Sequence, residues 1–353
     1  MGDNGFVRSD LRRFLLDAGA SDDDIARAES EGWLPLLALD RLVTPGRPTH
    51  DIAEVAKLAG CDEDRLRSLW RAVGFPDVPE GLAAFTDADV RAARLALDGA
   101  FARRADFATV LRHVRVISWS MSRVAAVLAE NYGDTVRNLR SEGVDDETIA
   151  WWIVEGFAAD ELESLLVYTA GLQLRAAAWR RMSLDAAPDV AVAIGFADLA
   201  GYTELSAELD PARLTEFVDT WEELAYDTVA EHGGRVVKTI GDEVMFAGLA
   251  AQVARTAVAL RDAAGAHGLP AVRSGIAAGM VVTRDGDFYG PVVNLASRLT
   301  EIAPPGVVYA SDAVHAELAA DVSFVWARAE THNLRSIGPV AAFSLLEVSG
   351  TRV

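Results

Sequence analysis

The sequence predicts an α+β chain made of an all-helical first part and a second part in which strands alternate with helices. Through residues 1–185, apolar side chains recur at helical spacing almost without interruption. Beyond about residue 190 the pattern changes to short apolar runs, separated by amphipathic segments and by turns that contain glycine. The 353 residues are enough for about two domains. We therefore predict a helical domain over 1–185 and a mixed domain over 186–353.

Short helices are predicted first. In SDLRRFLLDAGASDDDIARAESEGWLPLLALDRLV, Ser21 followed by the run Asp22–Asp24 is typical of a helix start. The stretch DIAEVAKLAGCDEDRLRSLWRAVGFP predicts two short helices around a turn at Gly60. Six residues of this pair are expected to face inward: Ile52, Val55, Ala56, Leu66, Leu69 and Trp70. With AFTDADVRAARLAL, the segment 50–96 resembles a winged helix-turn-helix of the MerR kind. Longer transmission helices are expected over 107–182.

The mixed part follows SLDAAPDV at 183–190, which we interpret as the linker because Pro188 stops a helix. VAVAIGFADL predicts a buried strand, and PARLTEFVDTWEELAYDTVAEHGG predicts an amphipathic helix that ends at Gly233–Gly234. RVVKTIGDEVMFAG predicts a hairpin with its turn near Gly241. The expected order continues with a helix over 250–266, a strand over 272–283, a helix over about 291–302, and then shorter strands and a helix.

Charge and composition argue against several classes of function. The formal net charge of −20 opposes a broad electrostatic grip on nucleic acid or on anionic lipid. Residues 1–110, which contain the helix-turn-helix segment, carry 20 acidic and 14 basic side chains, and this balance is unfavourable for DNA binding. The N-terminus has no apolar signal core, and no 18-residue apolar run is free of charge. We expect a soluble, cytoplasmic protein with no transmembrane segment and no nucleic-acid partner.

Carboxylates stand at two strand ends of the mixed part. FADLAGYT places Asp198 at the end of an apolar strand, and the hairpin turn presents Asp242 with Glu243 beside it. Oxygen ligands of this kind suit Mg²⁺, which usually keeps water molecules and substrate phosphates as further ligands. The alternative is that either aspartate is only a turn or cap residue.

A third polar cluster lies in DFYGPVVNLASRL. Asn294 and Arg298 are four residues apart in a predicted helix and therefore share one face. Gly290 followed by Pro291 indicates a tight strand-to-helix entry, which is a suitable place for a phosphate to approach. The alternative is an ordinary solvated helix face.

In this order and spacing, FADLAGYT, GGRVVKTIGDEVMF and DFYGPVVNLASRL resemble the catalytic domain of class III nucleotidyl cyclases over about residues 190–347. The resemblance implies a ferredoxin-like sheet with helices on one side, and a homodimer with active sites at the subunit interface. It implies that Asp198 and Asp242 hold two divalent ions, Mg²⁺ or Mn²⁺, which assist attack of the ribose 3′-hydroxyl on the α-phosphate. Asn294 matches the residue that orients the ribose, and Arg298 matches the residue that stabilises charge on the α-phosphate. The implied products are 3′,5′-cyclic AMP and pyrophosphate.

Lys238 and Asp287 match the family's base-reading pair, and their chemistry fits adenine. Adenine presents an acceptor at N1 and a donor amino group at N6, whereas lysine only donates and aspartate only accepts. Guanine has the opposite polarity, so the implied substrate is ATP. Lys57 and Lys238 are the only lysines in an arginine-rich chain, which favours a specific role for Lys238 over a strand lysine that merely reaches solvent. All six matched positions are filled in one chain. A homodimer would therefore have two equivalent sites, with Lys238 and Asp242 serving different ones.

The γ-phosphate contact and the activity itself each have an alternative interpretation. In NLRSIGPV, Arg335 is a candidate contact for the γ-phosphate, but Ile337 stands nearer to the position where relatives often have a basic residue. The alternative function is a catalytically silent cyclase-like domain that serves as a dimeric interaction module, although six filled positions favour an active enzyme. A diguanylate cyclase would need a Gly-Gly-Asp/Glu-Glu-Phe turn, and TIGDEVMF does not provide one.

The first part resembles the helical regulatory domain of soluble mycobacterial adenylyl cyclases of the pH-sensing type, best over DIAEVAKLAGCDEDRLRSLWRAVGF. The resemblance implies a dimerising module that responds to pH, or to a fatty acid or other lipid. The histidines are the natural titrants, and the sequence does not choose among them, although His113 lies in the helical stretch LRHVRV. The six are His50, His113, His232, His267, His315 and His332.

Overall fold

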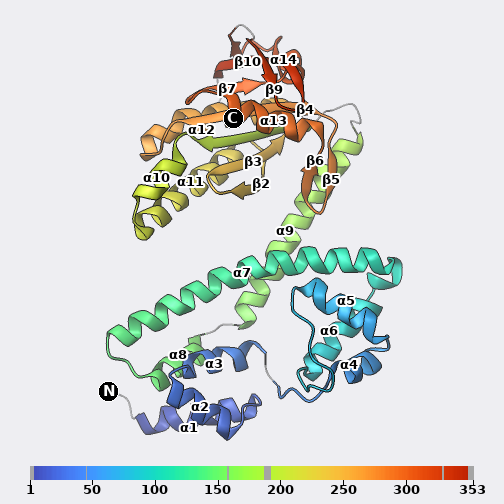
Figure 1. Cartoon of the computed structure of the whole chain (residues 1–353), viewed down its shortest axis with the longest axis vertical. Coiled ribbons are helices and arrows are strands. Elements are labelled where there is room, and N and C mark those ends of the chain that lie inside the picture. Colours follow the sequence, from blue (N-terminus) through green and yellow to red (C-terminus); the bar gives the residue numbers. More distant parts are fainter. Residues whose placement is uncertain (1–3, 45, 157–158, 187–191, 328–329, 349–353) are drawn as a thin grey trace. The chain divides into compact units, whose positions relative to one another are not determined.

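A computed structural model of the chain describes residues 4–44, 46–156, 159–186, 192–327 and 330–348 (Figure 1). The chain divides into two compact units, Met1–Ala176 and Ala177–Val353. The predicted domain boundary, between residues 185 and 186, lies nine residues after this division, and residues 187–190 of the predicted linker lie outside the described residues. Within the described residues, no helix combines the length and the apolar character that crossing a membrane requires.

The first unit is built of helices, as predicted, with an isolated β-bridge between His50 and Phe85. The elements are α1 (Asn4–Asp17), α2 (Asp22–Glu31), α3 (Leu34–Val43), α4 (Ile52–Ala59), α5 (Glu63–Val73), α6 (Asp87–Asp98), the 3₁₀ turn η1 (Ala102–Arg104), α7 (Phe107–Ser141), α8 (Asp146–Gly156) and α9 (Ala159–Ala186), which continues past the division.

Two small cores organise this unit. Apolar side chains of α1, α2, α3 and α8 form one, and those of α4, α5 and α6 form the other. Ser21 caps α2 in a capping box with Asp24, which confirms the predicted helix start. Gly60 has φ 76° between α4 and α5, as expected of the predicted turn.

The second unit combines a sheet with helices. Its elements are β1 (Val192–Leu199), α10 (Tyr202–Glu208), α11 (Pro211–Glu231), β2 (Arg235–Ile240), β3 (Glu243–Gly248), α12 (Ala250–Ala264), the 3₁₀ turn η2 (Gly265–His267), β4 (Val272–Gly279), β5 (Val282–Arg284), β6 (Asp287–Tyr289), α13 (Pro291–Ile302), β7 (Val308–Ala310), α14 (Asp312–Leu318), β8 (Phe324–Trp326), β9 (Glu330–Leu334) and β10 (Gly338–Val348).

Most of these strands form one sheet in the order β2-β3-β1-β4-β7-β10-β8, with β9 paired to β10. The pair β4–β7 is parallel, and the other pairs in this sheet are antiparallel. β5 and β6 form a separate two-stranded sheet. The predicted strand over 272–283 is therefore wrong in one respect, because the chain leaves the main sheet at Gly279, which has φ 153°.

Helices cover both faces of the main sheet. Trp221 of α11 and Val253 of α12 pack in one core with Phe246, while Ala296 of α13 packs in another core with Ile194 and Met245. Residues 245 and 246 point to opposite faces of β3, so the two cores lie on opposite faces. The expectation of helices on one side only is therefore wrong.

The close packing of α13 depends on Gly275 in β4. A Cβ atom at this position would lie 2.3 Å from both the Ala296 carbonyl oxygen and the Thr300 nitrogen. Glycine therefore lets α13 approach the sheet backbone, and this brings the polar residues of α13 to the face of the sheet that carries Asp198.

Candidate active site

The strand register brings the first two predicted residues together. β1 pairs antiparallel with β3, with Ala197 opposite Val244, so the end of β1 lies beside the turn that precedes β3. Asp198 therefore meets Asp242, which follows Gly241 in the two-residue turn of the β2–β3 hairpin. The turn is held from the other face, because the buried Trp221 donates an Nε1 hydrogen bond of 2.8 Å to the Asp242 carbonyl oxygen.

This corner of the sheet carries excess negative charge. Burial and the adjacent Asp198 carboxyl, through both a hydrogen bond and its charge, raise the pKa of Asp242 to about 6. Burial raises the pKa of the neighbouring Glu243 to about 7, with further contributions from the charges of Asp198, Asp242 and Glu301. Crowded carboxylates with raised pKa values indicate a site that favours a cation.

The donor atoms fit a hard divalent cation. Asp198 is mostly buried, with 14% of its side chain exposed, and both aspartates offer oxygen ligands. Within the described part of the chain, no cluster of three or more His, Cys, Asp or Glu side chains has the arrangement of a complete metal cage. Mg²⁺ commonly uses one or two carboxylates together with substrate phosphates, so a pair of aspartates is sufficient.

Arg273 is a site residue that sequence reasoning missed. It lies on β4 directly opposite Asp198, and its Nε and Nη2 atoms lie 2.6 and 2.5 Å from the Asp198 Oδ2 atom. Its Nη1 atom also donates to the Glu301 carbonyl oxygen of α13, at 3.4 Å. The sequence does show an arginine near the start of the otherwise apolar strand VRSGIAAG, and such a charge needs a partner. Only the pairing register shows that the partner is Asp198.

The predicted base-reading pair is in direct contact. The Lys238 Nζ atom lies 2.5 Å from the Asp287 Oδ2 atom, and the backbone nitrogen of Phe288 donates to Asp287 Oδ1 at 2.8 Å. Lys238 comes from β2 and Asp287 from β6, so two separate sheets supply the pair. The side chains remain 34% and 22% exposed, which leaves them accessible to a ligand.

The remaining predicted residues stand apart from these pairs. Asn294 is exposed and Arg298 half-buried on α13, where the Arg298 Nη1 atom bonds the Glu301 Oε1 atom. Arg335 is exposed in the turn between β9 and β10. In the part of the chain that the structure describes, no hydrogen bond or ion pair joins Asn294, Arg298 or Arg335 to either pair. The structure therefore forms two pairs within one chain and leaves these three residues separate from them.

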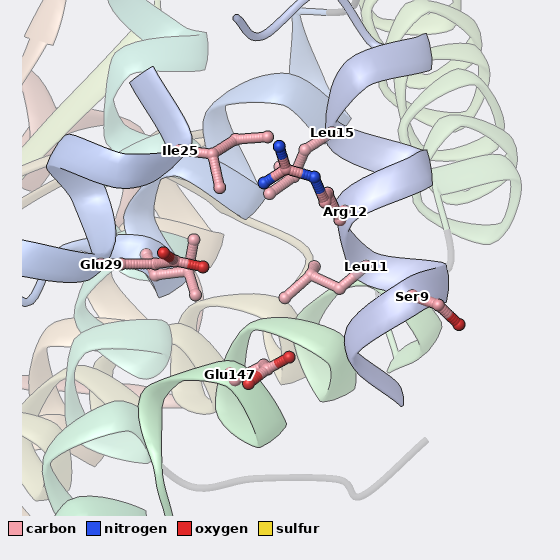
Figure 2. Close-up of a pocket in the computed structure, with 8 residues that line it drawn as sticks. Ser9, Leu11, Arg12, Leu15, Ile25, Glu29 and Glu147 are labelled. Carbon is pink, nitrogen blue, oxygen red and sulfur yellow. The ribbon is translucent and has the colours of Figure 1, made fainter. Parts of the chain in front are cut away.

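The first unit contains a cavity of about 380 Å³ among α1, α2, α3 and α8 (Figure 2). Leu11, Leu15, Ile25 and Leu34 supply its apolar lining, and Ser9, Arg12, Glu29 and Glu147 supply its polar lining. Arg12 is the one cation among these lining residues, and its Nη2 atom lies 2.5 Å from the Asp22 Oδ1 atom. A fatty-acid carboxylate would have to compete with Asp22 for this guanidinium.

Comparison with known proteins gives consistent matches. The family model described as the adenylate and guanylate cyclase catalytic domain matches residues 184–347. An adenylate cyclase of Streptomyces coelicolor is 34% identical over 318 residues, which cover 86% of this chain and 82% of that protein. An adenylate cyclase of Glutamicibacter nicotianae is 30% identical, covering 87% of this chain and 81% of that protein. A pH-sensitive adenylate cyclase of Mycobacterium tuberculosis is 30% identical, covering 95% and 87% respectively.

Asp242→Asn is expected to stabilise the metal-free protein at about pH 8. The pKa of Asp242 is raised to about 6, so its contribution to stability is fully present below its ordinary pKa and is lost as the pH rises through 6. The asparagine removes the ionised form, and a gain of about 1 kcal/mol in unfolding free energy is expected at pH 8 after allowance for solvent screening.

Thermal unfolding in EDTA at about pH 4 and pH 8 checks this expectation, with Asp219→Asn, an exposed residue of α11, as the matched control. The two variants should behave alike at the lower pH, and only Asp242→Asn should gain stability at the higher pH. A loss of stability by Asp242→Asn at pH 8 in EDTA would show that the carboxylates are not in conflict.

Proposed function

Because the chain belongs to the class III adenylate and guanylate cyclase family, we propose that it is an adenylyl cyclase that converts ATP to 3′,5′-cyclic AMP and pyrophosphate. The direct contact of Lys238 with Asp287 is the observation that favours ATP over GTP as the substrate. The pair presents a donor-only and an acceptor-only group side by side, which matches the acceptor N1 and the donor amino group of adenine. A guanine in the same place would meet a donor with a donor and an acceptor with an acceptor, and each mispaired group costs about 1–3 kcal/mol.

Asp198 and Asp242 are proposed to hold divalent cations, Mg²⁺ or Mn²⁺. Bound there, such ions would lower the pKa of the ribose 3′-hydroxyl and neutralise charge on the triphosphate. Before a cation binds, Arg273 compensates part of the charge on Asp198 through its two short contacts. Arg298 is proposed to stabilise the charge on the α-phosphate, a role that suits a permanently charged guanidinium, and Asn294 to orient the ribose.

The working form is proposed to be a homodimer. Asn294 and Arg298 have no direct contact with the aspartate pair in the described chain, although the reaction needs all four residues around one nucleotide. A symmetric pair of chains could bring α13 of one copy to the aspartates of the other and would form two equivalent sites. Arg335 is proposed only as a contact for the γ-phosphate, since its exposed turn leaves it available to a second chain or to the nucleotide.

An assay of the purified full chain with Mn²⁺ or Mg²⁺ is expected to give cyclic AMP from ATP, with a rate from GTP lower by at least about tenfold. Asp242→Ala should reduce the rate by a factor on the order of 100 or more, because a cation ligand is removed. The Asp219→Asn variant serves as the surface control. Absence of product from the wild-type chain would favour the silent interaction module, and equal rates with ATP and GTP would refute the base-reading role of Lys238 and Asp287.

We further propose that the helical unit regulates the rate, in response to pH or to a lipid. The relatives' similarity extends over this unit as well as the catalytic one, and one of them is named as pH-sensitive. His113 is a candidate titrant on α7, where its Nδ1 atom lies 2.8 Å from the Thr109 carbonyl oxygen and its ring packs on Phe101. The cavity lined by Leu11 and Leu15 is the candidate place for a lipid chain.

Comparison of the full chain with a chain that starts at residue 186 tests this regulation. The rates should differ by several-fold, and the difference should change across about pH 5.5 to 8 or with added fatty acid. Loss of the pH effect in His113→Ala would identify the titrant, with His267→Ala in the catalytic unit as the control. Identical rates for the two chains under all these conditions would reduce the helical unit to a dimerisation device.

A further inference from the structure

The hairpin that carries Asp287 is not part of the main sheet. Among the described strands, β5 and β6 pair only with each other, and all three residues of β5 are exposed. Asp285 and Gly286 form the tight turn between them, with φ 55° and 83°. An isolated two-stranded hairpin is at best marginally stable in water. The position of Asp287 therefore depends on side-chain contacts between the hairpin and the rest of the unit.

Arg235, the first residue of β2, supplies two of these contacts. Its Nη1 and Nη2 atoms both donate to the Gly286 carbonyl oxygen, at 3.1 Å each. Its guanidinium lies over the Phe288 ring, with the Cζ atom 5.1 Å from the ring centroid. These contacts hold the residues immediately before and after Asp287.

A β-bulge places Arg235 and Lys238 on the same face of the sheet. In a regular strand, residues three apart point to opposite faces. Here Arg235 pairs with Ala247 and Lys238 pairs with Met245, because Val237 is an extra residue in β2. Ala247 and Met245 belong to the same core cluster, so their partners also share that face. The bulge thus lets β2 contact residues 286, 287 and 288 in succession.

We infer that Arg235 is a positioning residue for base selection: it fixes the β5–β6 hairpin on β2 and thereby sets the place of Asp287 relative to Lys238. This inference rests on the proposed function. A planar guanidinium can reach a carbonyl with two nitrogens while stacking on a ring, whereas a lysine ammonium can do only part of this. Recognition of adenine requires both Lys238 and Asp287 at fixed positions, since a site whose polar groups shift loses discrimination between bases.

Arg235→Gln tests the inference in the full chain, with Arg235→Lys as the variant that keeps the charge. Arg213→Gln is the control, because Arg213 is an exposed arginine of α11, outside the hairpin that carries Asp287. The measurements are kcat/KM for ATP and for GTP, and equilibrium binding of the α,β-methylene analogues of both nucleotides, which the reaction cannot cleave. Thermal unfolding of each variant reports any general loss of folding.

Arg235→Gln is expected to lower the ratio of ATP to GTP, in turnover and in binding, by roughly tenfold. Arg235→Lys should give a smaller loss, and Arg213→Gln should leave the ratio unchanged. In an Asp287→Asn background, Arg235→Gln should have almost no further effect on the ratio, because Arg235 acts through Asp287. An unchanged ratio in Arg235→Gln, or an equal and additional loss in the Asp287→Asn background, would overturn the inference.

The same measurements test the adenylyl cyclase activity and the positioning role of Arg235 separately. If the wild-type chain makes no cyclic AMP, the enzyme proposal falls, and the binding ratios of the analogues still decide the role of Arg235. If the wild-type chain makes cyclic AMP with a preference for ATP that Arg235→Gln retains, the enzyme proposal stands and the positioning role falls.

Discussion

The close approach of the Asp198 and Asp242 carboxyl groups is the constraint on which the catalytic unit depends. The antiparallel register of β1 and β3 imposes it, since the end of one strand must lie beside the start of the other. Burial of the Asp242 carboxyl, and then the adjacent Asp198 carboxyl, disfavour the ionised form and raise the pKa of Asp242. Trp221 and Arg273 hold the arrangement, the first through the turn backbone and the second through Asp198. The fold therefore keeps a corner of high negative charge that a divalent cation would relieve.

One face of the main sheet carries the larger apolar core, and the other face carries the polar residues of the candidate site. One face is covered by α11 and α12 and forms the largest apolar core of the unit. The other face carries α13, the aspartate pair and, through the bulge in β2, Arg235 and Lys238. A single face thus presents the groups proposed for the metals, the base and the phosphates. Gly275 contributes to this by allowing α13 to lie close to β4.

Much of the fold was predictable because local signals agreed with the final structure. The helix expected over about 291–302 is found at Pro291–Ile302, since Gly290 and Pro291 mark its start clearly. The hairpin around Gly241 was predicted from its turn residues. The end of β4 at Gly279 and the position of α13 on the second face were not predicted, because they depend on packing between distant segments.

The candidate site, like the fold, was only partly predictable from the sequence. The resemblance singled out Lys238 and Asp287 as a base-reading pair, but it did not predict their direct contact. The contacts of Arg273 and Arg235 were not predicted either, because each depends on which residue lies opposite in another strand or hairpin. Strand register is not encoded in any short motif, so these partners appear only in the folded chain.

In the proposed homodimer, a second copy of the chain completes each site. The most direct test is the activity of a mixture of two variants, Asp242→Ala and Arg298→Ala, co-expressed and purified together. Each variant alone should be almost inactive. With random pairing, half of the dimers are mixed and each mixed dimer has one intact site, so about a quarter of the wild-type rate should return. A mixture as inactive as its two components would contradict the shared site.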